Sequence, residues 1–302
     1  MAHSPLSRRG FFSHSLGLAA AGYASAGVPR DPGVKLKLAL NAYSFDKPLK
    51  AGSMTLDDVV HFCAQHKVDA LDATGYYFPG YPKVPSDEFL YNFKKTAFLN
   101  GVQISGTGVR NDFAVADAAA RARDVQMVMA WIEVAQKLGA TVLRVFSGRA
   151  RPEGYTFEQA LGWMIPEFQE CAAYGRRHGV MLGLQQHNDF LKTADETIRV
   201  LEAVNAAPEA SGWFGDILDV GSLRTKDPYQ EIEELVPWAV SWQIKEKVGY
   251  GDKEVDTDLQ RVKAIIDKVG YRGLLPFEAL GEGDPRERVA AFLEKIRRAF
   301  SL

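Results

Sequence analysis

Two carboxylates and two amides stand at the ends of short apolar runs in the second half of the chain. Gln185 follows Leu-Gly-Leu, Asp219 follows Ile-Leu, Gln243 follows Ser-Trp and Glu278 follows Leu-Pro-Phe. Two carboxylates that face the same space repel each other unless a cation or a shared proton relieves the repulsion. If the fold brings these four side chains together, the chemistry they offer is cation binding or proton transfer.

Other polar residues lie close to the same strand ends. Because side chains alternate faces along a strand, His187 shares a face with Gln185, and Lys245 shares one with Gln243. Taken singly, a polar residue at a strand end is usually an ordinary solvated loop residue. The joint placement favours a site, with His187 and Lys245 as catalytic candidates. The candidates for substrate binding are Arg144, Asp72, Asn41 and Gln186.

The histidines limit the kind of metal that such a site takes. The chain has six, and only His187 follows a predicted strand; the others fall near the N-terminus or in predicted helices. A histidine-rich zinc site is therefore not expected. A metal held mainly by oxygen ligands would be Mn, Mg or Ca.

The elements that must position these residues alternate strand and helix along the chain. Between the strands, apolar residues recur at helical spacing, as in Leu56, Val59, Val60 and Cys63. Such alternation implies a parallel sheet, and eight units in this length close a (β/α)8 TIM barrel in a single α/β domain. The predicted strands are 35–44, 70–74, 102–106, 141–146, 180–187, 213–219, 240–245 and 273–279.

Helix-boundary residues support these divisions. Thr156 with Gln159, and Thr193 with Glu196, predict capping boxes that open helices. Glycines at helix ends favour the left-handed backbone that leads into the next strand; they are Gly101, Gly139, Gly179 and Gly270. The alternative, an open doubly wound sheet, normally has a glycine-rich phosphate turn after its first strand, and residues 41–45 contain no glycine.

With these strands in place, the chain resembles the sugar isomerases and epimerases of the xylose-isomerase-like barrel type, and within them an exported bacterial subgroup. The resemblance covers nearly all of the chain after the leader. It implies metal ligands at the ends of strands five to eight, usually Glu, Asp, His and Glu. The matching positions are Gln185, Asp219, Gln243 and Glu278. A divalent cation such as Mn or Mg is therefore expected as cofactor.

Two departures from that pattern bear on mechanism. Gln185 replaces a carboxylate that serves in the epimerases as both ligand and base, and Gln243 replaces a histidine. A mechanism that needs only one base remains possible without a carboxylate at position 185. Glu278 would then remove a proton next to a carbonyl, while metal, Arg144 or Lys245 stabilises the enolate oxygen and His187 acts as a second acid or base.

Three functions remain open on these residues. The first is isomerisation or epimerisation of a sugar or keto-sugar. The second is a lyase reaction that cleaves 3-keto-glycosides by β-elimination. The third is a non-catalytic sugar-binding protein whose metal site has decayed. All three have a small-molecule sugar or glycoside as partner, and none predicts an oligomeric state.

Composition excludes some other classes. The 302 residues include 46% hydrophobic and 25% charged residues, which are globular values. A net charge of −2 provides no general attraction to nucleic acid or to anionic membranes. The two cysteines, Cys63 and Cys171, fall in helical patterns and are expected to be buried free thiols.

The first residues form a targeting pattern rather than part of the fold. Arg8 and Arg9 precede a short apolar stretch and an Ala-Ser-Ala sequence at 24–26. This order indicates a twin-arginine signal peptide at 1–26, a linker at 27–33 and the barrel at 34–302, with export to the periplasm. The apolar stretch is too short to span a bilayer, and no other span is expected in the mature protein.

Overall fold

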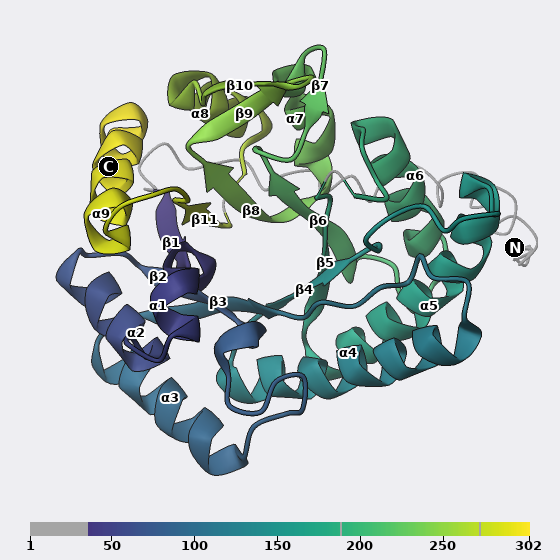
Figure 1. Cartoon of the computed structure of the whole chain (residues 1–302), viewed down its shortest axis with the longest axis horizontal. Coiled ribbons are helices and arrows are strands. Elements are labelled where there is room, and N and C mark those ends of the chain that lie inside the picture. The colour runs from purple at the N-terminus through teal and green to yellow at the C-terminus, as the bar shows by residue number, and fades with distance from the viewer. Residues whose placement is uncertain (1–35, 188, 272) are drawn as a thin grey trace, which may run out of the picture.

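A computed structural model describes residues 36–187, 189–271 and 273–302. Within these residues, eight parallel strands close into a barrel in the order β1-β11-β8-β6-β5-β4-β3-β2 (Figure 1). Each overlaps one of the eight predicted strands, so the predicted barrel is confirmed. The strands are β1 (Lys37–Asn41), β2 (Ala70–Thr74), β3 (Gln103–Gly108), β4 (Val142–Phe146), β5 (Met181–Gln185), β6 (Phe214–Asp219), β8 (Ala239–Lys245) and β11 (Leu274–Glu278).

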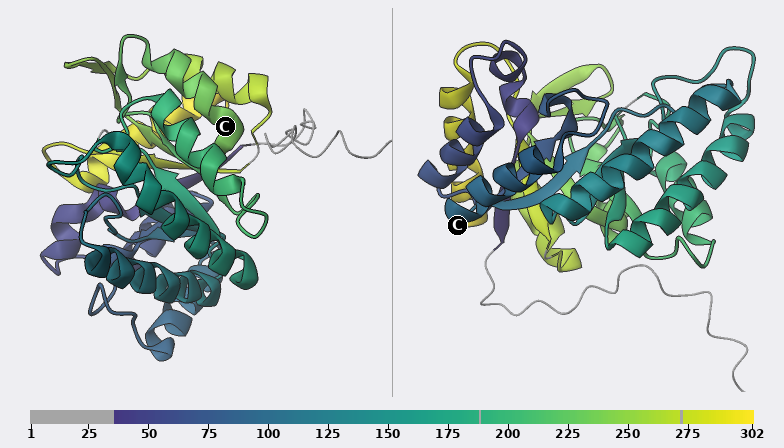
Figure 2. Two further views of the ribbon diagram at one scale, coloured as in Figure 1. Left: turned by 90° about the vertical axis from the view of Figure 1, so that its right-hand side faces the viewer. Right: turned by 90° about the horizontal axis from the view of Figure 1, so that it is seen from below.

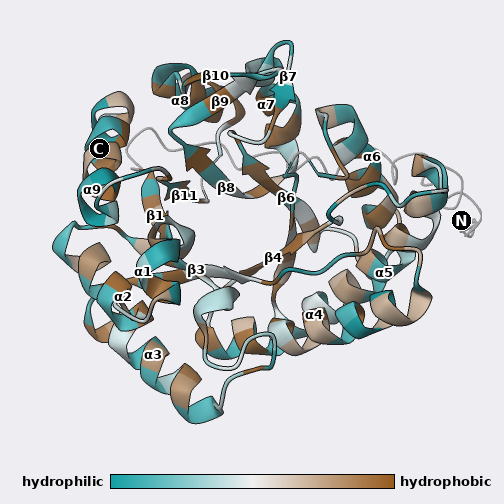
Figure 3. Ribbon diagram, viewed as in Figure 1, coloured by the Kyte–Doolittle hydropathy of each residue, from teal (hydrophilic) through white to brown (hydrophobic). Residues whose placement is uncertain are grey.

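Closure joins the first strand to the last. Leu40 of β1 pairs with Phe277 of β11, and both side chains are fully buried. The strands are rich in Val, Leu and Ile because helices cover the outer face of the sheet while the inner face fills the barrel. In Figure 3 several barrel strands are brown, while the surrounding helices carry both brown and teal residues.

The helices form the outer ring. The two longest, α4 and α5, run side by side along one side of the barrel (Figures 1 and 2). The full set is α1 (Asp46–Lys50), α2 (Leu56–Gln65), α3 (Asp87–Leu99), α4 (Ala118–Leu138), α5 (Phe157–His178), α6 (Ala194–Asn205), α7 (Pro228–Leu235), α8 (Leu259–Val269) and α9 (Pro285–Phe300), with short 3-10 turns at Ala42–Phe45, Gly75–Tyr77 and Val236–Trp238.

The predicted helix boundaries are largely confirmed. Thr156 and Gln159 form a complete capping box. Thr193 caps α6 through the N–H of Glu196, but the Glu196 carboxylate accepts from the N–H of Lys192 instead, so this second box is only half formed. All four predicted glycines have positive φ, between 68° and 78°.

A small second sheet was not predicted. It consists of β7 (Arg224–Thr225), β9 (Lys247–Tyr250) and β10 (Lys253–Asp256), in the order β10-β9-β7. Its strands follow β6 and β8 directly, so it stands over the rim where those barrel strands end (Figures 1 and 2). The segments are short and mostly polar, and therefore carry no clear strand pattern.

Two further predictions concern buried and apolar residues. Cys63 and Cys171 are both buried and free, as expected. Among the helices of the described part of the chain, none combines the length and apolar character needed to cross a membrane. The predicted leader and linker, residues 1–33, lie outside the described residues.

Candidate active site

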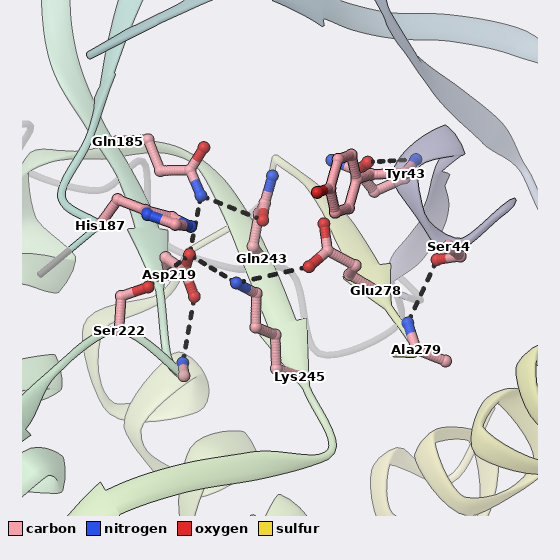
Figure 4. A network of polar contacts seen from close by, with 12 residues as sticks. Tyr43, Ser44, Gln185, His187, Asp219, Ser222, Gln243, Lys245, Glu278 and Ala279 are labelled. Carbon is pink, nitrogen blue, oxygen red and sulfur yellow. Dashed lines mark hydrogen bonds and ion pairs between the residues drawn. The ribbon is translucent and has the colours of Figure 1, made fainter. Parts of the chain in front are cut away.

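The carboxyl rim of the barrel brings the predicted strand-end residues together. Gln185, Asp219, Lys245 and Glu278 are the last residues of β5, β6, β8 and β11, and Gln243 lies two residues before the end of β8. Because parallel strands of a barrel end at one rim, residues far apart in sequence share one space there (Figure 4).

Lys245 lies between the two carboxylates. Its Nζ is 2.8 Å from Oδ2 of Asp219 and 3.4 Å from Oε1 of Glu278. The Lys245 side chain is 15% exposed, while those of Asp219 and Glu278 are 0% and 5% exposed. The carboxylates that were expected to need a cation are thus neutralised in part by an ammonium group of the chain itself (Figure 4).

Asp219 is saturated with hydrogen-bond donors. Its Oδ2 accepts from Nε2 of Gln185 at 2.7 Å, from Oγ of Ser222 at 2.8 Å and from Lys245. Its Oδ1 accepts from the N–H of Gly221 at 3.1 Å. Burial opposes ionisation, but Lys245, His187 and the hydrogen bond from Ser222 outweigh it and lower the pKa of Asp219. Asp219 is therefore a fixed anion rather than a base.

Glu278 differs from Asp219 in its partners. Burial raises its pKa above the ordinary value, Lys245 offsets part of this rise, and the charge of Asp219 adds to it. Burial also favours the neutral amine of Lys245, yet the two carboxylates raise the pKa of that group, so it carries a proton at neutral pH. The arrangement pairs a basic carboxylate with an adjacent cation, which is what removal of a proton next to a carbonyl requires.

The two glutamines form a chain of hydrogen bonds beside Asp219. Nη1 of Arg144 donates to Oε1 of Gln185 at 3.2 Å, which fixes the orientation of that amide. Nε2 of Gln185 then donates to Asp219 and, at 3.2 Å, to Oε1 of Gln243. Gln185 is therefore committed to partners through both its oxygen and its nitrogen, and Gln243 through its oxygen.

Arg144 is held by aromatic rings. Its guanidinium carbon lies 5.1 Å from the ring centre of Tyr76 and 4.5 Å from that of Phe146, and Nη2 donates to the Tyr76 hydroxyl at 2.8 Å. Arg110 lies 5.5 Å from the same Tyr76 ring. Among the described residues, neither guanidinium has a carboxylate within ion-pair distance. Both are available to a ligand oxygen that carries or develops negative charge.

Two adjoining cavities meet at Glu278. A narrow cavity of about 60 Å³ and a wider cleft of about 460 Å³, which lies toward the small sheet, share His187, Lys245 and Glu278 in their walls. In addition, the narrow cavity is lined by Asn41, Tyr43, Thr74, Tyr76, Arg110, Arg144, Phe146, Gln185 and Gln243.

Of the remaining residues predicted to bind substrate, one lines a cavity and two do not. Asn41 lines the narrow cavity, but its Oδ1 already accepts from the N–H of Tyr43 at 2.8 Å and from the hydroxyl of Thr74 at 3.2 Å. Asp72 is buried and absent from the walls of both cavities, and burial raises its pKa to about 6 against the opposing charge of Arg144. Gln186 bonds to the main chain of β6 and lines neither cavity.

His187 is the most open of the predicted residues. Its side chain is 43% exposed, its Nδ1 lies 3.4 Å from a carboxylate oxygen of Asp189, and its ring meets Phe146 edge-on at 5.7 Å. It borders both cavities, so it is accessible to a ligand from the side of solvent.

Sequence reasoning missed five residues of the narrow cavity: Tyr43, Thr74, Tyr76, Arg110 and Phe146. Thr74 and Phe146 are the last residues of β2 and β4, and the other three follow the end of β1, β2 or β3 by two residues. Polar or aromatic residues at or just after a strand end were the available signal, and from the first three strands only Asn41 and Asp72 were predicted.

The four predicted metal ligands lie together, but their donor set does not fit a divalent ion. Two are amides, and Gln185 turns its NH2 group rather than its oxygen toward Asp219. The ammonium of Lys245 lies beside the oxygens that an ion would share. In the part of the chain that the structure describes, no three His, Cys, Asp or Glu side chains are grouped to hold a metal.

Solved structures with the same barrel include several enzymes. D-psicose 3-epimerase of Clostridium cellulolyticum H10 superposes with a TM-score of 0.72 at 15% identity, over 88% of this chain and 99% of the other. The probable 3-DHS dehydratase AsbF of Bacillus anthracis gives 0.64 at 15% identity, over 86% and 98%. The IolI protein, whose structure contains a zinc atom, gives 0.68 at 14% identity, over 88% and 100%.

These identities establish the fold alone. A search among curated protein sequences finds no match. The family model described as "xylose isomerase-like TIM barrel" matches residues 60–299, which is well over half of the chain. The protein therefore belongs to the family of xylose isomerase-like TIM barrels.

Proposed function

We propose that the protein is a sugar isomerase or epimerase that acts on a sugar or keto-sugar, with Glu278 as its single essential base. The observation that carries the proposal is the position of Glu278. It borders both cavities, its pKa is raised, and Lys245 lies 3.4 Å away. The epimerase and dehydratase among the structural neighbours support an enzyme of this general kind.

The proposed reaction starts with proton transfer. The Glu278 carboxylate takes the proton from the carbon next to the substrate carbonyl, and the C–H electron pair moves to form the enolate. The ammonium of Lys245 and the guanidinium of Arg144 stabilise the negative oxygen. For isomerisation, the enolate oxygen gains a proton and the hydroxyl on the deprotonated carbon loses one, so that a new carbonyl forms there as the proton returns to the neighbouring carbon. Return of a proton to the other face of the same carbon gives epimerisation.

The second acid or base of this scheme is not Gln185, because an amide accepts no proton near neutral pH. His187 borders both cavities and is open to solvent. We assign it the role of delivering or removing the second proton.

A second candidate is β-elimination from a 3-keto-glycoside. The wider cleft of about 460 Å³ adjoins Glu278 and offers room for a leaving group beyond the reacting sugar. The first step is the same proton abstraction. The enolate then expels the glycosidic oxygen, which takes a proton from His187 or water.

Solvent deuterium exchange tests the proton abstraction. Incubation with ketoses and with 3-keto-glycosides in D2O should place deuterium next to the carbonyl. Glu278→Gln should slow exchange on the order of 10²- to 10⁴-fold. The matched control is Glu282→Gln, because the Glu282 side chain is highly exposed and, among the described residues, its carboxylate pairs with the exposed Lys47 alone.

Three outcomes would contradict the proposal. One is normal turnover by Glu278→Gln. A second is turnover in which hydrogen moves within the substrate without exchange, which indicates a hydride shift instead. The third is tight sugar binding with neither exchange nor turnover, which identifies a non-catalytic binding protein.

A further inference from the structure

We infer that the ammonium group of Lys245 takes the place of the divalent metal expected for this barrel, so that the site works without a metal ion. The inference deepens the proposed function, in which Lys245 faces the enolate oxygen. Its test, however, measures metal binding and does not depend on any activity.

The first argument is one of space. Nζ of Lys245 lies 2.8 Å from Asp219 and 3.4 Å from Glu278. A metal ion coordinated by the same two carboxylates would sit about 2.0–2.6 Å from their oxygens. That position overlaps the ammonium group. The two cations cannot occupy it together, and Figure 4 shows Lys245 reaching between these two carboxylates.

The second argument concerns the donors around this position. A metal requires lone pairs directed at it, whereas the site directs hydrogens at Asp219 from Gln185, Ser222 and Lys245. The Gln185 amide cannot turn its oxygen inward without breaking its bond from Arg144, which is itself buried and held by two rings. Oε1 of Gln243 already accepts from Gln185.

The third argument is charge. The ligand set implied by the resemblance has three carboxylates and a neutral histidine around a divalent ion, for a net charge of −1. Here two carboxylates surround one ammonium, and the net charge is again −1. The change from Glu to Gln at 185 and the exchange of a metal for an ammonium therefore compensate each other. Adding a divalent ion to the present set would leave an unbalanced buried positive charge.

The replacement also alters the chemistry that the site offers. An ammonium group can stabilise an enolate oxygen by a charge-assisted hydrogen bond, as a metal does by coordination. Unlike a metal, it can also donate a proton to that oxygen. The reaction then needs nothing beyond the residues of the chain.

Calorimetric titration of the purified protein with Mn²⁺ and with Zn²⁺ tests the inference. We expect no stoichiometric binding to the wild-type protein, and no change of melting temperature on adding EDTA. The triple variant Gln185→Glu, Gln243→His, Lys245→Met restores the ligand set and removes the ammonium. It should bind one Mn²⁺, at least on the order of 100-fold more tightly than any weak binding by the wild type, because ligand charge sets affinity for such ions.

Circular dichroism establishes that each variant is folded before titration. Stoichiometric micromolar binding by the wild type that Asp219→Asn abolishes would overturn the inference. A folded triple variant that binds no more tightly than the wild type would overturn the assignment of this position to the metal. If the triple variant does not fold, the wild-type titration decides alone. Absence of exchange with every sugar contradicts the proposed function but not this inference.

Discussion

Gln185 and Gln243 show how an amide in place of another ligand group changes the chemistry of a site. A carboxylate at 185 would accept a proton and bind a cation, whereas the amide donates its NH2 hydrogens to Asp219 and Gln243. As a result, Asp219 is held as an anion by neighbouring donors, and Glu278 remains the one carboxylate of this group with a raised pKa. The division of roles between the two carboxylates follows from their partners.

This division predicts the pH dependence of the reaction. A general base must be deprotonated, so the rate of proton abstraction should rise with pH through the pKa of Glu278, above the ordinary value of about 4.3. Because the ammonium of Lys245 opposes the rise, Lys245→Met should move this acid limb to higher pH. The pH profile of deuterium exchange measures both the acid limb of the wild type and its shift in Lys245→Met. If the acid limb of the Lys245→Met profile does not move, or moves to lower pH, Glu278 is not the base that this limb reports.

A second buried acid, Asp216, gives a prediction about stability. It is fully buried on β6, and neither carboxyl oxygen has a hydrogen-bond partner among the described residues. Burial raises its pKa well above the ordinary value, and the charge of Asp219 adds to the rise. The folded state therefore holds the proton more tightly than the unfolded state, and stability falls as pH rises above about 3.9.

Asp216→Asn removes that ionisation with little change of shape. It should raise the free energy of unfolding by about 1–3 kcal/mol at neutral pH, and the gain should vanish below about pH 4. Denaturant unfolding at several pH values measures this. Asp252→Asn, in the exposed turn between β9 and β10, is the matched control. A gain independent of pH would exclude ionisation as its cause.

At the scale of elements, the loop after β6 fixes the position of Lys245. A Cβ on Gly221 would lie 2.7 Å from Cδ of Lys245 and 3.1 Å from the carbonyl oxygen of Lys247. The main chain of this loop therefore packs directly against the lysine stem, while the Gly221 N–H bonds to Asp219. The loop thus holds both charged groups of the ion pair in place.

Gly221→Ala should push Lys245 away from Asp219 and leave the barrel folded. We expect the rate of exchange to fall on the order of tenfold or more, since small displacements of catalytic groups have large effects. Gly162→Ala in α5, where a Cβ meets nothing within 4 Å, is the control and should leave the rate unchanged. An unchanged rate in Gly221→Ala would show that the lysine position is not limiting.

The elements also show what could be predicted from sequence. All eight barrel strands were predicted because each is a short buried run closed by turn or cap residues. The residues at the ends of β5, β6, β8 and β11 were predicted because strand ends define the rim. Tyr43, Tyr76 and Arg110 were not: they follow strand ends, but the turns there carry no periodic signal that tells which side chains face the cavity. The contact of Lys245 with both carboxylates depends on side-chain packing, which sequence spacing does not determine.

At the scale of the whole molecule, the barrel closes only when its first and last strands meet. β1 starts at Lys37 and pairs with β11, which ends at Glu278. The fold is therefore complete only after nearly the entire chain has been synthesised. From the Arg8-Arg9 pattern we propose that the protein is exported by a twin-arginine route, which carries proteins that are already folded.

The last prediction concerns processing and export, which rest on residues outside the described part of the chain. Cleavage after Ala26 would leave every strand and helix of the barrel intact, because the first of them begins at Lys37. The exported protein should therefore begin near Gly27, and its melting temperature should equal that of the full-length chain. Mass spectrometry and thermal unfolding check these points. Replacing both Arg8 and Arg9 by lysine should abolish export. Export that persists in that variant, or an exported chain that retains Met1, would contradict the signal-peptide hypothesis.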